Sequence, residues 1–263
     1  MNHQKPQDTQ GELEYQARQA AELGAVHATP PETMRRYREH KDWRLFVKEY
    51  LFHCIERAAP RRICNLGCGA GETCTELAHI GYHVTGFDLS PELIALAVRR
   101  AELDRVTDRA TFLVADALKL ETVPEPFDLV LVQAALHHME VPVVLDALDR
   151  LLKPGGTLVI QEPVAFLPWL QRLRNRTSVS RDFSPNERPL NQTDLAQIEA
   201  RFDVVEKRFY NLFARFLRFV PDLAWVNHQR AVPLRWLDHL LTTHLPFTRR
   251  FAGVMVAVYR KRR

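Results

Sequence analysis

The sequence predicts an α/β fold built on a doubly wound, mostly parallel sheet. Three observations lead to this class. Short apolar runs alternate with helical patterns from residue 61 to 153, a glycine-rich segment follows the first apolar run, and acidic residues stand at the ends of later runs. A repeated strand–helix order favours a parallel sheet, because each helix carries the chain back to the start of the next strand.

The expected strands are seven apolar runs, and three helical patterns follow the first, second and fourth of them. The Lys-Pro-Gly-Gly segment at 153–156 is expected to form a turn before the fifth strand. The predicted strands are 63–66, 83–87, 111–115, 129–133, 157–161, 203–210 and 253–259, and the helices between them are 72–80, 91–103 and 141–152.

The two ends of the chain and two insertions are expected to surround this core. A short helix over 12–23 carries no visible chemistry, and apolar positions spaced by threes and fours over 32–57 predict one or two amphipathic helices. We therefore divide the chain into an N-terminal tail with cap helices, 1–58, and a main domain, 59–263, with cap insertions at about 163–189 and 211–251.

Composition limits the classes of protein to consider. With 263 residues and 46% hydrophobic content, the chain can bury the core of one large α/β domain. It has no apolar run of about 18 residues, and its first ten residues are polar, so we expect neither a membrane span nor a signal peptide and place the protein in the cytoplasm.

Charge is distributed unevenly along the chain. Residues 204–263 contain 12 Lys and Arg and three Asp and Glu, a balance of +9, which leaves −5 for residues 1–203 of a chain with net charge +4. A basic region of this kind can attract nucleic acid, anionic lipid or an acidic substrate, and it is equally consistent with an ordinary solvated face.

The four cysteines, Cys54, Cys64, Cys68 and Cys74, match no common zinc or disulfide spacing. We therefore expect reduced, mostly buried thiols and no metal.

The sharpest motif is the segment from Asn65 to Thr73, with sequence Asn-Leu-Gly-Cys-Gly-Ala-Gly-Glu-Thr. It follows an apolar strand and leads into a helix, and its glycines (Gly67, Gly69 and Gly71) permit a tight turn and a close approach of ligand to backbone. Dehydrogenases use a related loop with G-x-G-x-x-G spacing, whereas the spacing here is G-x-G-x-G.

The next strand ends in Gly-Phe-Asp-Leu-Ser, which places Asp88 21 residues after Gly67 and Leu89 beside it. A carboxylate at this point can accept hydrogen bonds from both hydroxyls of a ribose. The alternative is that Asp88 only caps the helix that begins at Pro91.

Two further strands end in polar residues. Asp116 and Ala117 follow the third strand, and the fourth runs from Asp128 through Gln133 to His137 and His138. Ligands of open α/β sheets bind at the carboxyl edge, so these segments converge on one crevice.

Taken together, residues from about 61 to 162 resemble the core of class I S-adenosylmethionine-dependent methyltransferases, in the branch with many small-molecule and quinone methyltransferases. The resemblance implies a seven-stranded, Rossmann-like sheet whose last strand is antiparallel and lies beside the fifth. It also implies S-adenosylmethionine as cofactor, with contacts from Gly67, Cys68, Gly69, Gly71, Asp88, Leu89, Asp116, Ala117 and Gln133. Asn65 is included in this set, although family members usually carry an acid there that helps to receive the ammonium group of the cofactor.

Methyl transfer from a sulfonium is an in-line displacement, so the main task of the enzyme is to position donor and acceptor and to exclude water. His137 and His138 are candidates for a base that removes a proton from a hydroxyl or amine acceptor, and the alternative is that they only pack the wall of the crevice. Glu162, just after the fifth strand, could orient the acceptor or only cap the chain that follows.

The acceptor is expected to be a bulky, partly apolar small molecule that is methylated on O or N, with C as a further option. Trp43 and Tyr50 of the N-terminal helices, near Lys48, would form its pocket together with the amphipathic segment after residue 208, or that segment only closes its own core. Arginines at the rim suit an acidic or a lipid-like acceptor, including one met at a membrane surface. The cap side chains are Phe209, Leu212, Phe213, Phe216, Leu217, Phe219 and Val220, with Arg208, Arg215 and Arg218.

Two other functions remain as alternatives. The basic C-terminal quarter could serve an RNA-directed methyltransferase or a non-catalytic nucleic-acid binder, although the fourth strand ends without an Asn/Asp-Pro-Pro-Tyr/Phe motif. A nicotinamide-dependent oxidoreductase is disfavoured by the glycine spacing and by the lack of a Tyr-x-x-x-Lys or similar hydride-transfer pair near the crevice.

Overall fold

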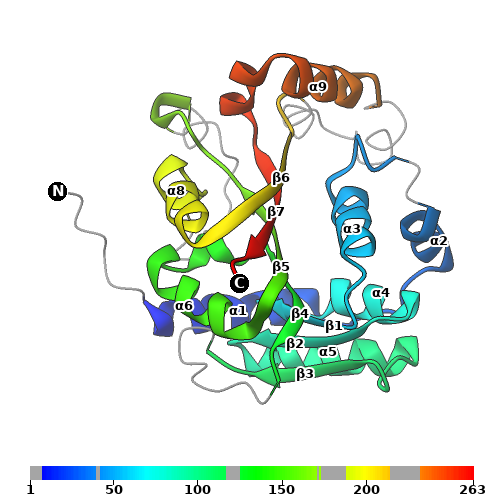
Figure 1. Cartoon of the computed structure of the whole chain (residues 1–263). Coiled ribbons are helices and arrows are strands. Elements are labelled where there is room, and N and C mark those ends of the chain that lie inside the picture. Colours follow the sequence, from blue (N-terminus) through cyan, green and yellow to red (C-terminus); the bar gives the residue numbers. More distant parts are fainter. Residues whose placement is uncertain (1–7, 40–41, 117–124, 171, 173–187, 214–231) are drawn as a thin grey trace.

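A computed structural model describes residues 8–39, 42–116, 125–170, 172, 188–213 and 232–263. In these parts of the chain, one seven-stranded sheet with the order β3-β2-β1-β4-β5-β7-β6 forms the centre of the molecule (Figure 1). The strands are β1 (Arg62–Leu66), β2 (His83–Asp88), β3 (Ala110–Val114), β4 (Phe127–Gln133), β5 (Leu152–Pro163), β6 (Phe202–Tyr210) and β7 (Val254–Lys261).

The direction of the strands confirms the predicted fold class. The pairs β1–β2, β2–β3, β1–β4 and β4–β5 are parallel. β7 lies antiparallel between β5 and β6, with Leu158 opposite Tyr259 and Tyr210 opposite Val254. Because β6 runs in the same direction as β5, the end of β6 lies at the same edge of the sheet as the ends of β1 and β4.

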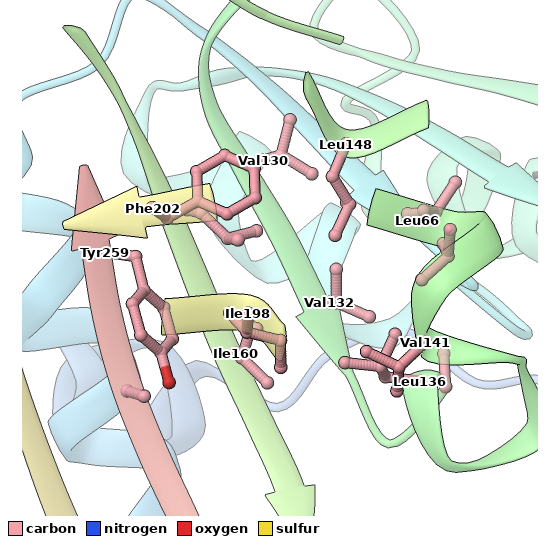
Figure 2. Packing of buried hydrophobic residues seen from close by; sticks show 14 of the residues in the cluster. Leu66, Val130, Val132, Leu136, Val141, Leu148, Ile160, Ile198, Phe202 and Tyr259 are labelled. Carbon is pink, nitrogen blue, oxygen red and sulfur yellow. The ribbon is translucent and has the colours of Figure 1, made fainter. Parts of the chain in front are cut away.

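Helices cover both faces of the sheet. One face packs against α3 (Val47–Ala58), α4 (Glu72–Ile80) and α5 (Pro91–Asp104), and the other against α6 (Val141–Leu151) and α8 (Gln192–Arg201) (Figure 1). Alternate residues of a strand point to opposite faces, so Leu129 and Leu131 join the first core while Val130 and Val132 join the second. Figure 2 shows the second core, in which Val132, Leu136 and Ile160 pack together beneath α6 and α8.

Local signals in the sequence explain where the helices begin. The Ser90 hydroxyl accepts a hydrogen bond from the Leu93 amide at 3.2 Å, and Pro91 occupies the first turn of α5. Asn191 and Asp194 form a capping box that starts α8, a helix that the sequence analysis did not predict. Asp8 caps α1 (Thr9–Leu23) by accepting a hydrogen bond from Gly11 N at 2.9 Å.

One segment agrees with expectation and another differs from it. The region 32–57 forms two helices, α2 (Pro31–Glu39) and α3, where one or two were expected. The segment 153–156, expected to be a turn, is an irregular part of β5, because Leu152 pairs with Phe127 and Thr157 with Leu129. A β-bulge absorbs the extra residues, and Gly155 adopts a φ of +72° within it.

The insertions are described only in part. The second contains α9 (Val232–His244) and η4 (Pro246–Phe251), and α9 lies near the end of β6 (Figure 1). Residues 173–187 and 214–231 lie outside the described residues, and with them the predicted cap residues Arg215, Phe216, Leu217, Arg218, Phe219 and Val220.

All four cysteines are free and buried, as the sequence predicts. Within the described ranges, no helix combines the length and the apolar character that crossing a membrane requires.

Candidate active site

The glycine loop between β1 and α4 forms the floor of a cavity. Its backbone is tied to β2, since the amides of Gly67 and Cys68 both donate to the carbonyl of Phe87, at 2.8 and 2.9 Å. Gly67 has a φ of +72°, and a Cβ at this position would lie 2.3 Å from the Cβ of Ala135. Glycine is therefore required here both by backbone conformation and by space.

Asp88 ends β2 and organises the same loop. Its carboxylate accepts hydrogen bonds from Gly69 N at 2.7 Å and from Ser90 N at 3.1 Å. Burial raises the pKa of Asp88, and these backbone hydrogen bonds oppose the rise. Ser90, and not Asp88, provides the side-chain cap of α5, so the helix-capping alternative for Asp88 is wrong.

The loop after β4 forms one wall of the cavity and is held in place by Glu162 of β5. One oxygen of this carboxylate accepts from the amides of Ala135 and Leu136, at 2.8 and 2.7 Å, and the other lies 2.6 Å from Nδ1 of His137. Glu162 is 1% exposed. These contacts favour a role in positioning the wall over direct contact with an acceptor.

Helix α1 covers the cavity from outside. Four of its polar residues, Glu12, Tyr15, Gln16 and Gln19, line the cavity. Oε1 of Glu12 lies 3.4 Å from Nδ1 of His138, and the rings of Tyr15 and His138 are 6.5 Å apart. The sequence analysis assigned no chemistry to this helix, so its contribution to the site was missed.

The cavity encloses about 780 Å³ of space, part of it open to solvent. Its charged lining residues are Glu12, Asp88 and Asp116, and we call it the acidic cavity. The other residues that line it are Tyr15, Gln16, Gln19, Leu66, Gly67, Gly69, Phe87, Leu89, Leu93, Ala115, Ala134, Ala135, His138 and Met139.

Five of the predicted cofactor residues line the acidic cavity, namely Gly67, Gly69, Asp88, Leu89 and Asp116. Ala117 lies outside the described residues. Of the two candidate bases, the cavity lining includes His138, whereas His137 is buried against Glu162. The geometry thus favours His138 over His137 for contact with a ligand.

Four predicted cofactor residues are outside the cavity lining. Asn65 is 2% exposed and donates to Sγ of Cys74 at 3.3 Å, while Cys68 packs beside Gly86. Gln133 accepts from the Thr73 hydroxyl at 2.8 Å. Gly71 packs closely against α5, where a Cβ on residue 71 would lie 2.7 Å from the Cβ of Ala97. This close packing is a structural reason for glycine at this position.

The predicted acceptor residues of the N-terminal helices belong to a packed aromatic group. Tyr50 is fully buried, which does not agree with a place in an acceptor pocket. Trp43 stacks on His53 with ring centres 4.7 Å apart, and the guanidinium of Arg208 lies 4.4 Å from the Trp43 ring. Lys48 is paired with Glu72 and Glu76 at 2.7 and 2.8 Å.

A second hollow of about 460 Å³ lies where β6 ends, beside α9. It contains four basic residues and one acid, Glu206, which is already paired with Arg57 and Arg208, each at 3.1 Å. We call this site the basic hollow. Its lining residues are Arg44, Glu206, Lys207, Arg208, Phe209, Tyr210, His239, Thr242, Thr243 and Arg249.

Comparison with known proteins agrees with the geometry of the acidic cavity. Residues 64–160 match the family described as a methyltransferase domain. The ubiquinone biosynthesis O-methyltransferase of Xylella fastidiosa (strain 9a5c) is 38% identical over 101 residues, which are 38% of this chain and 40% of that protein. The demethylmenaquinone methyltransferase of Clavibacter sepedonicus is 38% identical over 109 residues, 41% of this chain and 43% of the relative.

A solved structure extends the fold comparison over most of the chain. The N-methyltransferase NodS from Bradyrhizobium japonicum WM9, in complex with S-adenosyl-L-homocysteine, has a TM-score of 0.55 at 15% identity. The match covers 95% of this chain and 98% of NodS. The fold is therefore shared well beyond the region in which sequence similarity is high.

The region 64–160 is therefore similar to S-adenosylmethionine-dependent methyltransferase domains, and the fold around it is shared with NodS. The match spans only about two fifths of the length of these curated relatives. The family match, 64–160, ends within β5, so it includes the glycine loop and the β4 loop of the acidic cavity but not α1, β6, α9 or any residue that lines the basic hollow.

Proposed function

We propose that this protein uses S-adenosylmethionine to methylate an O or N atom, or in the alternative a C atom, of a bulky, partly apolar small molecule. The observation that carries this proposal is the charge of the acidic cavity. Among the described residues that line it, Glu12, Asp88 and Asp116 are acidic and none is lysine or arginine.

The sign of this charge distinguishes between nucleotide ligands. Unit charges 4 Å apart interact by about 4 kcal/mol at an effective dielectric constant near 20. Such a cavity repels the pyrophosphate of a dinucleotide and attracts the sulfonium and ammonium groups of S-adenosylmethionine. Ribose would bind at Asp88 and adenine near Asp116, at the ends of the neighbouring strands β2 and β3.

His138 supplies the candidate base. It lines the acidic cavity with its Nδ1 3.4 Å from Oε1 of Glu12, and its imidazole would accept a proton from the acceptor. Glu162 and His137 would act behind it by fixing the wall on which His138 stands. S-adenosylmethionine would supply the methyl group from its sulfonium, and the imidazole of His138 would take up the proton that the acceptor loses.

The acceptor is the less defined part of the proposal. The two relatives are named for reactions of ubiquinone biosynthesis and of demethylmenaquinone, which supports a bulky, partly apolar acceptor. The basic hollow further supports an acidic group on that acceptor, since Arg44, Arg208 and Arg249 line it. Neither the domain match nor these relatives support the nucleic-acid alternative.

Calorimetric titration tests the cofactor assignment. Purified protein should bind S-adenosylmethionine and S-adenosylhomocysteine with micromolar affinity and should not bind NADH, whose pyrophosphate the three carboxylates repel. Binding of NADH in preference to S-adenosylmethionine would contradict the proposed function.

A further inference from the structure

The acidic cavity contains a carboxylate that comes from outside the matched methyltransferase region. Glu12 lies on α1, and its residue is only 3% exposed. Its Oε1 is 3.4 Å from Nδ1 of His138 and 3.4 Å from Nε2 of Gln16 on the next turn of the helix. A buried carboxylate is costly unless it has partners or a cation to neutralise it.

The position of Glu12 along the edge of the sheet identifies the part of a ligand that it would meet. The strand order places β3 with Asp116 first, then β2 with Asp88, and then β1 and β4. Glu12 contacts His138, which follows β4. A nucleoside held at Asp116 and Asp88 would therefore direct its aminoacyl group toward Glu12.

The glycine loop does not supply a carboxylate to this end of the cavity. Asn65 is neutral, is 2% exposed and donates its amide hydrogen to Cys74, and it is not among the residues that line the cavity. The aminoacyl half of S-adenosylmethionine carries the positive sulfonium and ammonium groups, so a negative side chain is needed there.

The mutual effect of the two carboxylates, Glu12 and Asp88, also favours binding of a cation in the cavity. Burial is the main cause of the raised pKa of Asp88, and the negative charge of Glu12 adds to it. The two carboxylates thus repel each other across the cavity, and a cation between them relieves this repulsion.

We propose that Glu12 is the carboxylate that binds the cationic aminoacyl half of the cofactor. This proposal rests on the proposed function. It makes α1 a part of the binding site and assigns to the N-terminal region the charge that Asn65 does not provide. The chain after α1 is tied to the far end of α5 by two hydrogen bonds of 2.6 Å from Thr29 to Asp104, which helps to fix the helix over the cavity.

Three ligands and two variants test this role by calorimetry. S-adenosylmethionine carries both positive groups, S-adenosylhomocysteine keeps only the ammonium, and 5′-methylthioadenosine keeps the nucleoside without either. Glu12→Gln should weaken binding of S-adenosylmethionine about tenfold or more and leave 5′-methylthioadenosine within about twofold, because only the former presents a charge to residue 12.

Glu14→Gln is the matched control, since Glu14 lies on the exposed side of the same helix and loses the same charge. It should leave the affinity for all three ligands unchanged. Circular dichroism and thermal unfolding of both variants show whether α1 and the fold are retained.

Two results would overturn the role of Glu12. One is unchanged affinity of folded Glu12→Gln for S-adenosylmethionine. The other is equal weakening of S-adenosylmethionine and 5′-methylthioadenosine, which would show that residue 12 only supports the cover of the cavity. If the wild-type protein binds none of the three ligands, the proposed function is rejected. The titration of the wild-type protein is sufficient to detect this outcome.

Discussion

The acidic cavity and the basic hollow lie at the same edge of one sheet and are built in different ways. The acidic cavity is shaped largely by backbone, with Gly67 and Gly69 in its floor and the β4 loop, held by Glu162, as a wall. The basic hollow is shaped by side chains from the loop before α3, from β6, from α9 and from η4. The sequence motifs and the domain match belong to the first site and not to the second.

The charges of the two sites follow the charge distribution of the chain. The acidic cavity uses residues from 12 to 139, within the part that has a balance of −5, while most of the basic hollow comes from residues 206–249, within the part with +9. From β4 to β6 there are three strand spacings of about 4.8 Å, or about 14 Å. An acceptor that is methylated at one site and anchored at the other must therefore be large and have an acidic end.

The largest expected effect concerns the backbone that shapes the acidic cavity. Gly67→Ala should reduce affinity for S-adenosylmethionine about 100-fold or more, because a non-glycine residue at positive φ costs ~1–2 kcal/mol and the new Cβ also displaces the loop of Ala135. Gly155→Ala is the control, because Gly155 has the same φ of +72° with no protein atom within 4 Å of the added Cβ.

Titration calorimetry and melting temperatures of both variants distinguish the effect of the positive φ from the effect of the contact with Ala135. Gly155→Ala should lose some stability and keep its affinity. Equal affinity of the two variants for the cofactor would show that the contact between Gly67 and Ala135 does not shape the cavity.

The second effect concerns the charge of the acidic cavity. Asp88→Asn should weaken cofactor binding by ~1–3 kcal/mol, because the ribose hydroxyls lose a charged acceptor. Burial raises the pKa of Asp88, so in the wild-type protein the affinity should be full at neutral pH and should fall as pH decreases through this raised pKa.

Titrations between pH 7 and pH 4 provide the measurement. The loss of affinity should begin at a higher pH than an ordinary aspartate, with a pKa of about 3.9, would give. The Asp88→Asn variant should not show this loss of cofactor affinity at low pH. If the variant still shows the loss, a group other than Asp88 causes it.

The smallest effect tests the basic hollow. Arg44 is exposed, and the contact found for its guanidinium is with the Trp43 ring, at 5.1 Å. In a screen of phenolic acids against their methyl esters as methyl acceptors, Arg44→Gln should lower the preference for the acid about three- to tenfold. Arg99→Gln, which removes the same charge from an exposed site on α5, should leave that preference unchanged. If the wild-type enzyme prefers the esters, the basic hollow does not bind an acidic group of the acceptor.

The sequence was sufficient where strand order alone determines the position of a residue. Strand ends in a parallel sheet must meet at one edge, so the positions of Asp88 and Asp116 followed from the strand–helix order. The antiparallel β7 was predicted through the family resemblance, since no periodicity in its sequence indicates its direction.

The sequence did not indicate contacts that arise from tertiary packing. Glu12 belongs to an ordinary amphipathic helix, and only the docking of α1 on α5 brings it to the cavity. Gly71 and Tyr50 were predicted to contact ligands. In the structure Gly71 packs against α5, and Tyr50 lies in the aromatic group beside Arg208. Such neighbours are distant in sequence, and no local pattern encodes them.

The contacts of Glu162 also have a consequence for the order in which the chain becomes functional during synthesis. The carboxylate that secures the β4 loop follows the matched segment 64–160, and Glu162 pairs with Met255 of β7. Until the last strand has left the ribosome, β5 presents an open edge that can pair with other chains. A nascent chain that ends with the matched segment therefore still lacks the carboxylate that secures the β4 loop, and until β7 is made its β5 edge is open to association with neighbouring chains.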